Sequence, residues 1–129
     1  VARADQIVRF YQALLHNPGR LWDPAVLEDG RGTVRCRLPD PVTGIPANRT
    51  LGLVAAGDDG RAALRGMGHT VSPRAFGHNG AAGQIAWADP DSGLSFVYLT
   101  NGIDRHFLRE ARRTVSIASR AGLVGAADA

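Results

Sequence analysis

The amino-acid sequence predicts an α+β fold, in which an antiparallel sheet with a C-terminal β-hairpin is covered by an N-terminal and a C-terminal helix. Three observations lead to this prediction. An amphipathic pattern begins almost at the first residue, and two alternating apolar runs flank a glycine-closed turn within residues 85–98. An apolar stripe with a spacing of four follows within residues 103–118.

The N-terminal helix is predicted to begin at Asp5, which would cap it, and to continue to Leu15. Asn17-Pro18-Gly19 would end it, because proline cannot continue a helix. Its apolar face consists of Ile7, Val8, Tyr11, Leu14 and Leu15.

A short second helix is predicted to begin near residues 23–24, with Pro24 in its first turn and with Val26 and Leu27 buried. It would end around Gly30 or Gly32. Prolines and glycines then interrupt residues 33–46, so that this stretch is expected to hold at most a short strand at residues 34–38. Further predictions are a strand at residues 49–55, a turn at residues 57–60, and a loop or an edge strand at residues 61–73.

The hairpin is predicted from strict alternation. Ile85 and Trp87 face one way, and Ala86 and Ala88 face the other, where their small side chains would let a helix pack closely. The second strand alternates in the same way between Leu94, Phe96 and Tyr98 on one face and Ser95, Val97 and Leu99 on the other. Residues 89–93 have the composition of a turn that is closed by a left-handed Gly93.

The last element is predicted as a helix over residues 104–121 that Gly122 ends, followed by a frayed tail at residues 124–129. The stripe expected to cover the sheet consists of Ile103, Phe107, Ala111, Val115 and Ala118. Arg109, Arg112 and Arg113 cluster on this helix with Glu110 among them, which favours a solvated helix face.

Composition limits the classes of function. The 129 residues suffice for one domain that could fold alone, because a domain of this size buries about two-thirds of its unfolded surface. All 15 basic residues are arginine, so this chain holds no Schiff-base lysine, Walker P-loop or Ser-x-x-Lys motif. The net charge of +3 is spread along the chain among 12 acidic residues, which does not favour binding to nucleic acid.

The sequence shows no apolar run of about 18 residues and no charged-then-apolar start, so neither a membrane span nor a signal peptide is predicted. The lone Cys36 cannot form an internal disulfide and is interpreted as a small hydrophobic residue. The chain starts with Val1 rather than methionine. We therefore expect a single partial domain from a longer protein, with a helical and irregular part at residues 1–75 and the hairpin and last helix at residues 76–122.

The sequence contains four histidines, which are candidate ligands or catalysts. His16 and His106 are interpreted as surface residues and His69 as a structural residue. None of the four is spaced from a cysteine, an acidic residue or another histidine as in a metal site, so no metal is predicted.

His78 has a different setting, because Gly77 and Gly80 flank the pair of His78 and Asn79. A ligand could lie against this backbone, close to the imidazole and to N–H groups that an edge strand leaves unpaired. Such donors suit a developing oxyanion. The glycine series Gly77, Gly80 and Gly83 does not predict a nucleotide site, because a strand rather than a helix follows it. The residue pattern alone leaves both a functional and a structural His78 open.

Residues 76–101 resemble the third active-site motif and the following hairpin of the serine β-lactamase and penicillin-binding-protein superfamily, specifically its class C-like esterases and lipases. In that family a strand carries Lys-Thr-Gly or, among esterases, His-x-Gly, and His78-Asn79-Gly80 stands in this place. The order of Asp89-Pro90, glycine turn, apolar strand and C-terminal helix is also similar, and residues 4–10 resemble a family helix.

The resemblance implies roles for four residues. His78 would occupy the place of the motif's lysine and bind toward the nucleophile or the substrate, while Asn79 and Gly80 would face the substrate. The backbone N–H of Ala81 would be the second oxyanion donor. The nucleophilic serine and its lysine would lie outside this chain, and no cofactor is implied.

The predicted function is therefore the C-terminal portion of a serine hydrolase that cleaves small carboxylic esters through an acyl-enzyme, with the chain inactive by itself. The alternative is a non-catalytic binding or interaction module, or a degenerate relative of the hydrolases. If the family's N-terminal strands are missing, an exposed sheet edge would favour self-association. No nucleic-acid or metal partner is predicted.

Overall fold

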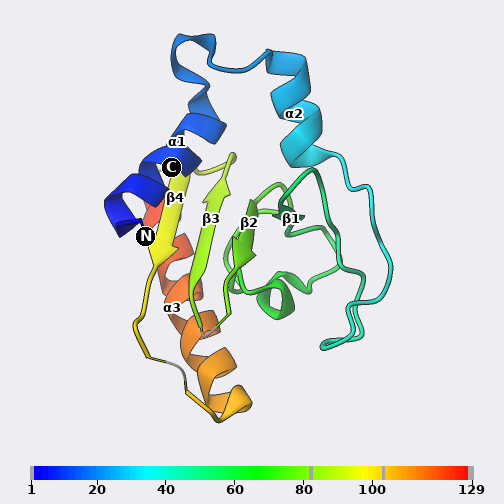
Figure 1. The fold of residues 1–129 in the computed structure, drawn as a ribbon, viewed down its shortest axis with the longest axis vertical. Helices are drawn as coiled ribbons and strands as arrows, with labels where there is room; N and C mark the ends of the chain where they lie inside the picture. Colours follow the sequence, from blue (N-terminus) through cyan, green and yellow to red (C-terminus); the bar gives the residue numbers. More distant parts are fainter. Residues whose placement is uncertain (1, 82, 103, 128–129) are drawn as a thin grey trace.

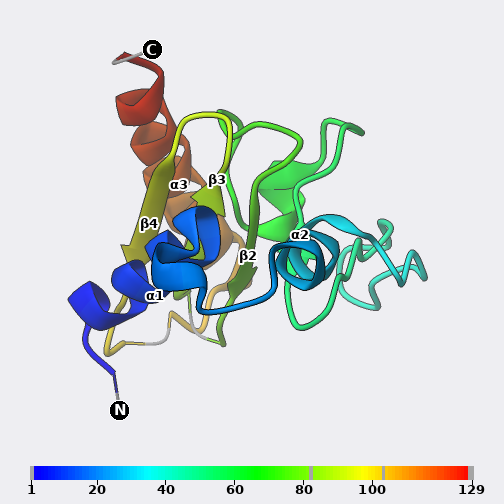
Figure 2. The same ribbon diagram turned by 90° about the horizontal axis from the view of Figure 1, so that it is seen from above.

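The computed structural model describes residues 2–81, 83–102 and 104–127. The four strands form one antiparallel sheet in the order β1-β2-β3-β4. Helix α1 lies over β3 and β4 on one face, and α3 runs across the opposite face (Figures 1 and 2). The described residues thus form the predicted α+β fold. In chain order the elements are α1 (Ala4–His16), the 3-10 turn η1 (Pro18–Arg20), α2 (Pro24–Gly32), β1 (Val54–Ala55), the 3-10 turn η2 (Ala62–Arg65), β2 (Phe76–Asn79), β3 (Ile85–Asp89), β4 (Leu94–Tyr98) and α3 (Phe107–Ala127).

The sheet separates two apolar clusters. On the face of α1, Tyr11 and Leu14 pack with Phe76 and Ala88. On the other face, Trp87 is completely buried among residues that include Val54, Ala56, Met67, Ala75 and Ile85. The two strands of the hairpin pair Asp89 with Leu94 and Ile85 with Tyr98. The predicted alternation of the hairpin is therefore confirmed, with Ala86 and Ala88 on the face that α1 covers.

Helix α1 begins differently from the prediction. Arg3 is the capping residue, and its backbone N–H donates to Oε1 of Gln6 at 3.0 Å, so Asp5 lies inside the first turn. The predicted end is confirmed: Asn17 has a left-handed backbone with φ 46°. The Asn17 amide exchanges two hydrogen bonds with the Trp22 backbone, which fixes the exit from the helix.

Helix α2 has the predicted bounds, but its predicted burial is wrong. Asp23 accepts hydrogen bonds from the N–H groups of Ala25 and Val26, which explains the start. The Val26 side chain is 63% exposed and Leu27 is only half-buried. A polar contact attaches the helix instead, because Nη1 of Arg31 donates to the carbonyl oxygen of Leu14 at 2.6 Å.

The predicted strand at residues 49–55 is shorter in the structure. The chain reverses direction after Arg49, which forms an isolated bridge with Val54, and Gly52 has φ 85° within this reversal. Only Val54–Ala55 continues as β1, paired with Gly77 and Phe76. Residues 33–46 are irregular as predicted, with single bridges at Cys36 and Pro39.

Residues 61–73 form a loop that contains η2, and a buried arginine holds it in place. The Arg65 side chain is 3% exposed and makes two 2.7 Å hydrogen bonds to the Asp59 carboxylate. Its remaining N–H groups donate to the carbonyl oxygens of Pro46 and Ala56. The hydrogen bonds that Arg65 donates to the Asp59 carboxylate lower the pKa of Asp59 to about 2.

Helix α3 continues to Ala127, so Gly122 does not end it and residues 124–127 are helical rather than frayed. A Cβ at Gly122 would lie 2.2 Å from Oγ1 of Thr70, which shows that this glycine allows the close approach of a loop. The predicted stripe is confirmed only in part. Ala118 is completely buried, but Phe107 is 63% exposed, and Glu110 and Thr114 are buried instead. The predictions for Ile103 in the stripe and for residues 128–129 in the tail fall outside the described residues. Among the described residues, the helices lack the combination of length and apolar character that a membrane span requires.

Candidate active site

The predicted motif lies at the end of β2, between the hairpin and the reversal after Arg49. His78 pairs with Ala86 and Asn79 pairs with Ile85, so the end of β2 is anchored to the start of β3. Adjacent strand residues project to opposite faces. His78 therefore shares the face of Phe76, while Asn79 lies on the other face, where its Cβ would be 3.2 Å from a Cβ added to Gly66.

Gly77 permits the close pairing of this strand. A Cβ at this position would lie 2.2 Å from the carbonyl oxygen of Ala86 and 2.6 Å from Cβ of Trp87. The sequence pattern suggested that Gly77 leaves room for a ligand. In the structure its missing side chain instead allows β2 to pair closely with β3. The exposed His78 and Asn79 follow directly after this buried position.

The turn after β2 carries the predicted oxyanion donor. The N–H of Gly80 donates to the carbonyl oxygen of Gln84 at 2.8 Å, which closes the turn and leaves Ala81 exposed beside it. Gly83 has φ 78°, a conformation that glycine adopts without strain. The structure therefore brings His78, Gly80 and Ala81 to one exposed end of the sheet.

Helix α3 supports this turn through Glu110, a contact that the sequence analysis did not anticipate. A Cβ at Gly83 would lie 1.4 Å from Oε1 of Glu110, so the carboxylate occupies the space that a side chain would need. Oε2 of Glu110 accepts from Arg113 at 2.5 Å, and Oγ1 of Thr114 donates to the Gly83 carbonyl at 3.4 Å. Arg109, Arg112 and Arg113 are exposed, as predicted for a solvated helix face, whereas the Glu110 side chain among them is only 11% exposed.

Arg49 is the second unexpected residue at this site. Its Nη1 lies 3.1 Å from Nε2 of His78, and Nδ1 of His78 lies 2.5 Å from the carbonyl oxygen of Asn79. Both side chains are exposed. No local sequence pattern joins residues 49 and 78; the tertiary structure brings them together.

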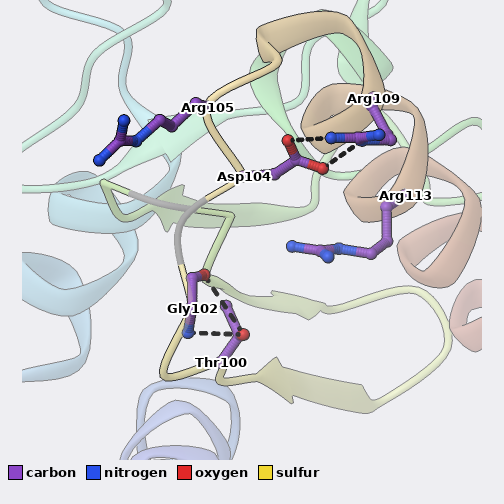
Figure 3. A pocket seen from close by; sticks show the side chains of 6 residues that line it. All are labelled: Thr100, Gly102, Asp104, Arg105, Arg109 and Arg113. Atoms are coloured by element: carbon purple, nitrogen blue, oxygen red, sulfur yellow. Dashed lines mark hydrogen bonds and ion pairs between the residues drawn. The ribbon is translucent and has the colours of Figure 1, made fainter.

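A polar pocket of about 550 Å³ lies at the same end of the sheet, beyond β4. Figure 3 shows Asp104 bound to Arg109, with Arg113 directed toward the same hollow and Arg105 pointing away. Hydrogen bonds from Arg109, and then from the backbone of His106, lower the pKa of Asp104 well below its usual range. The lining residues, Thr100, Gly102, Asp104, Arg105, Arg109 and Arg113, include none of the four predicted site residues.

The other histidines do not assemble into a second site. His16 is exposed at the last turn of α1, and His106 is exposed just before α3. The backbone N–H of His69 donates to Oγ of Ser119 at 2.9 Å, so this position links its loop to α3. Within the described ranges, no group of three or more histidine, cysteine or acidic side chains is arranged to hold a metal ion.

The fold and the site together define a mixed α+β domain with a His-Asn-Gly strand end beside a helix-supported turn. Residues 1–119 match the family model described as Beta-lactamase. The chain therefore belongs to the beta-lactamase family, which places it in the serine hydrolase superfamily. A search of curated proteins found no relative that matches it.

Proposed function

We propose that the chain is the C-terminal part of a serine hydrolase that cleaves carboxylic esters through an acyl-enzyme, with the nucleophilic serine and its lysine outside residues 1–129. The supporting observation is the end of β2, where His78, Asn79 and Gly80 precede a turn that exposes Ala81. Membership of the beta-lactamase family and the absence of lysine from the sequence support the same proposal.

In this mechanism the serine oxygen attacks the ester carbonyl and forms a tetrahedral oxyanion. The N–H of Ala81 and the N–H of the nucleophile donate to that oxyanion, and removal of one such donor costs about 100- to 1,000-fold in rate. The alcohol then leaves, and water releases the acid from the acyl-enzyme. His78 lies beside the turn, where it contacts the nucleophile or the substrate.

The test uses the full-length protein that contains these residues and a p-nitrophenyl ester. We expect a burst of nitrophenol followed by slower turnover, and a large loss of the burst rate in His78→Ala. His16→Ala is the matched control, because His16 is exposed at the end of α1. Equal rates for both variants would refute the role of His78, and labelling of a serine within residues 1–129 by a fluorophosphonate would refute the placement of the nucleophile.

The alternative, a non-catalytic interaction module, is favoured by one observation. Among the strands that the structure describes, β4 pairs with β3 alone, so its other edge has unpaired backbone groups that suit a second copy of this chain. Light scattering on the 129-residue chain would then show a dimer that Leu99→Lys weakens, whereas the control Leu64→Lys leaves it unchanged. A monomer at high concentration would refute self-association through this edge.

A further inference from the structure

One side of α3 carries exposed residues at a regular spacing. Positions 110, 114, 118 and 122 are buried, whereas positions 108, 112, 116, 120 and 123 are exposed. Residues three or four apart share one side of a helix, so the exposed positions form a continuous stripe. We call it the outer stripe; its members are Leu108, Arg112, Ser116, Arg120 and Leu123. Because the buried positions face the sheet, the outer stripe faces away from it (Figure 2).

The arginines of the outer stripe carry charge that the described chain does not neutralise. Asp104 and Glu110 are the two acidic residues within residues 104–127, and each is paired with another arginine of α3. The ion pairs formed among the described residues include neither Arg112 nor Arg120. The outer stripe therefore presents a positive surface to the solvent.

Leucines lie at both ends of the same stripe. Leu108 is 65% exposed and Leu123 is 57% exposed. Their positions are about 22 Å apart along the helix axis, since each residue adds about 1.5 Å. A hollow of about 600 Å³ opens near the first leucine, and its lining includes Leu108, Arg112 and Ser116. The stripe thus combines apolar side chains with cationic groups that bind phosphate oxygens.

This combination favours a lipid surface over other anionic partners. Nucleic acid and acidic protein segments match the arginines by charge, but they offer no apolar medium for the two leucines. A bilayer with anionic lipids offers phosphates to the arginines and, directly below them, the boundary of the acyl chains. The described helices lack the character of a membrane span, so the contact would lie along the surface of the bilayer.

We propose that the outer stripe docks the protein onto the surface of a bilayer that contains anionic phospholipids. Arg112 and Arg120 bind lipid phosphates, while Leu108 and Leu123 enter the boundary between headgroups and acyl chains. The helix lies parallel to the surface, and the sheet stays on its solvent side. This inference goes beyond the proposed ester hydrolysis and does not depend on it, because binding to lipid requires no catalysis.

Sedimentation of the full-length protein with lipid vesicles tests the proposal. One set of vesicles is pure phosphatidylcholine, and the other contains about one-third phosphatidylglycerol, which makes the surface negative. We expect binding to the anionic vesicles at about 0.1 M salt and release at about 0.5 M, because salt screens the attraction. Equal binding to both sets of vesicles would overturn the proposal.

Arginine variants locate the contact. Arg112→Gln combined with Arg120→Gln should lower the partition coefficient about 10- to 30-fold, because each arginine near an anionic surface contributes severalfold. Lysine at both positions should retain most of the binding. The matched control combines Arg9→Gln with Arg20→Gln, which removes the same charge from exposed positions of α1 and the turn after it. Circular dichroism checks that each variant is folded. Equal losses in the two glutamine pairs would refute docking through α3.

Leucine variants separate a lipid surface from other anions. Leu108→Gln combined with Leu123→Gln should weaken vesicle binding without changing its salt dependence, whereas Leu38→Gln, at a 72% exposed loop residue, should leave it unchanged. Binding to DNA or polyglutamate without binding to anionic vesicles would overturn the proposal and identify another acidic partner. If no ester is hydrolysed but the vesicles are bound as described, the proposed function fails while the docking surface stands.

Discussion

The contact between Gly83 and Glu110 links α3 to the turn of the candidate site, and Gly83→Ala perturbs it directly. The new Cβ would lie 1.4 Å from Oε1 and 2.4 Å from Cδ of Glu110, so the carboxylate has to leave its niche. The backbone at this position has φ 78°, which an alanine adopts only with strain. Both effects destabilise the turn that carries Ala81.

The two contributions can be estimated separately. The left-handed conformation costs alanine about 1 kcal/mol. Overpacking against a side chain that is only 11% exposed adds about 1–3 kcal/mol. The ion pair of Glu110 with the 40% exposed Arg113 contributes little to this sum, because solvent screens it. The expected loss in the free energy of unfolding is therefore about 2–4 kcal/mol, or roughly 6–15 °C in Tm.

Urea unfolding followed by circular dichroism measures this loss, and Gly93→Ala is a matched control. Gly93 has φ 70°, but nothing lies within 4 Å of a Cβ placed there. We expect Gly93→Ala to lose only the backbone contribution of about 1 kcal/mol. Adding Glu110→Ala to Gly83→Ala should restore part of the stability, since the obstructing carboxylate is gone. Equal destabilisation by Gly83→Ala and Gly93→Ala would refute the argument.

Three further predictions concern the scaffold. The pKa of Asp59 falls from 3.8 to about 2 on folding, so Asp59→Asn should lose about 1–2 kcal/mol at pH 7 after allowance for solvent screening. This difference should vanish as the pH falls from about 4 to 2, and a pH-independent difference in urea titrations would contradict it. Arg65→Gln should destabilise by about 3 kcal/mol or more, because buried carbonyl oxygens lose their donors; a midpoint within error of the wild type would contradict this. Gly30→Ala in α2 should be neutral or stabilising by up to about 1 kcal/mol, whereas Gly122→Ala should destabilise by clashing with Thr70, and thermal melts that rank them in the opposite order would refute this.

The elements that the sequence predicted well are those in which a local pattern determines the structure. Residues 85–98 alternate between large and small side chains, and a sheet with different neighbours on its two faces requires this alternation. Asn17 and Asp23 mark a helix end and a helix start through their own side-chain hydrogen bonds. Such signals depend on a few adjacent residues and can be read without tertiary contacts.

The sequence-based predictions failed where the role of a residue depends on a contact with a residue far along the sequence. Gly122 was predicted to end a helix, but it lies inside α3 and allows the close approach of Thr70. Val26 was predicted to be buried, but α2 is attached to α1 by the hydrogen bond from Arg31 to the Leu14 carbonyl oxygen. In the candidate site, His78 and Ala81 were predicted from the motif, whereas Arg49 and Glu110 were not. Both depend on long-range packing, and a charged residue on a helix gives no sign in the sequence that it is buried.

Detection of the acyl-enzyme tests the central claim most directly. The full-length protein is mixed with p-nitrophenyl acetate, quenched during the burst, digested and analysed by mass spectrometry. The account predicts an acetylated serine outside residues 1–129, which accumulates much more slowly in His78→Ala than in His16→Ala. An acetylated serine within residues 1–129, or equal accumulation in the two variants, would contradict it.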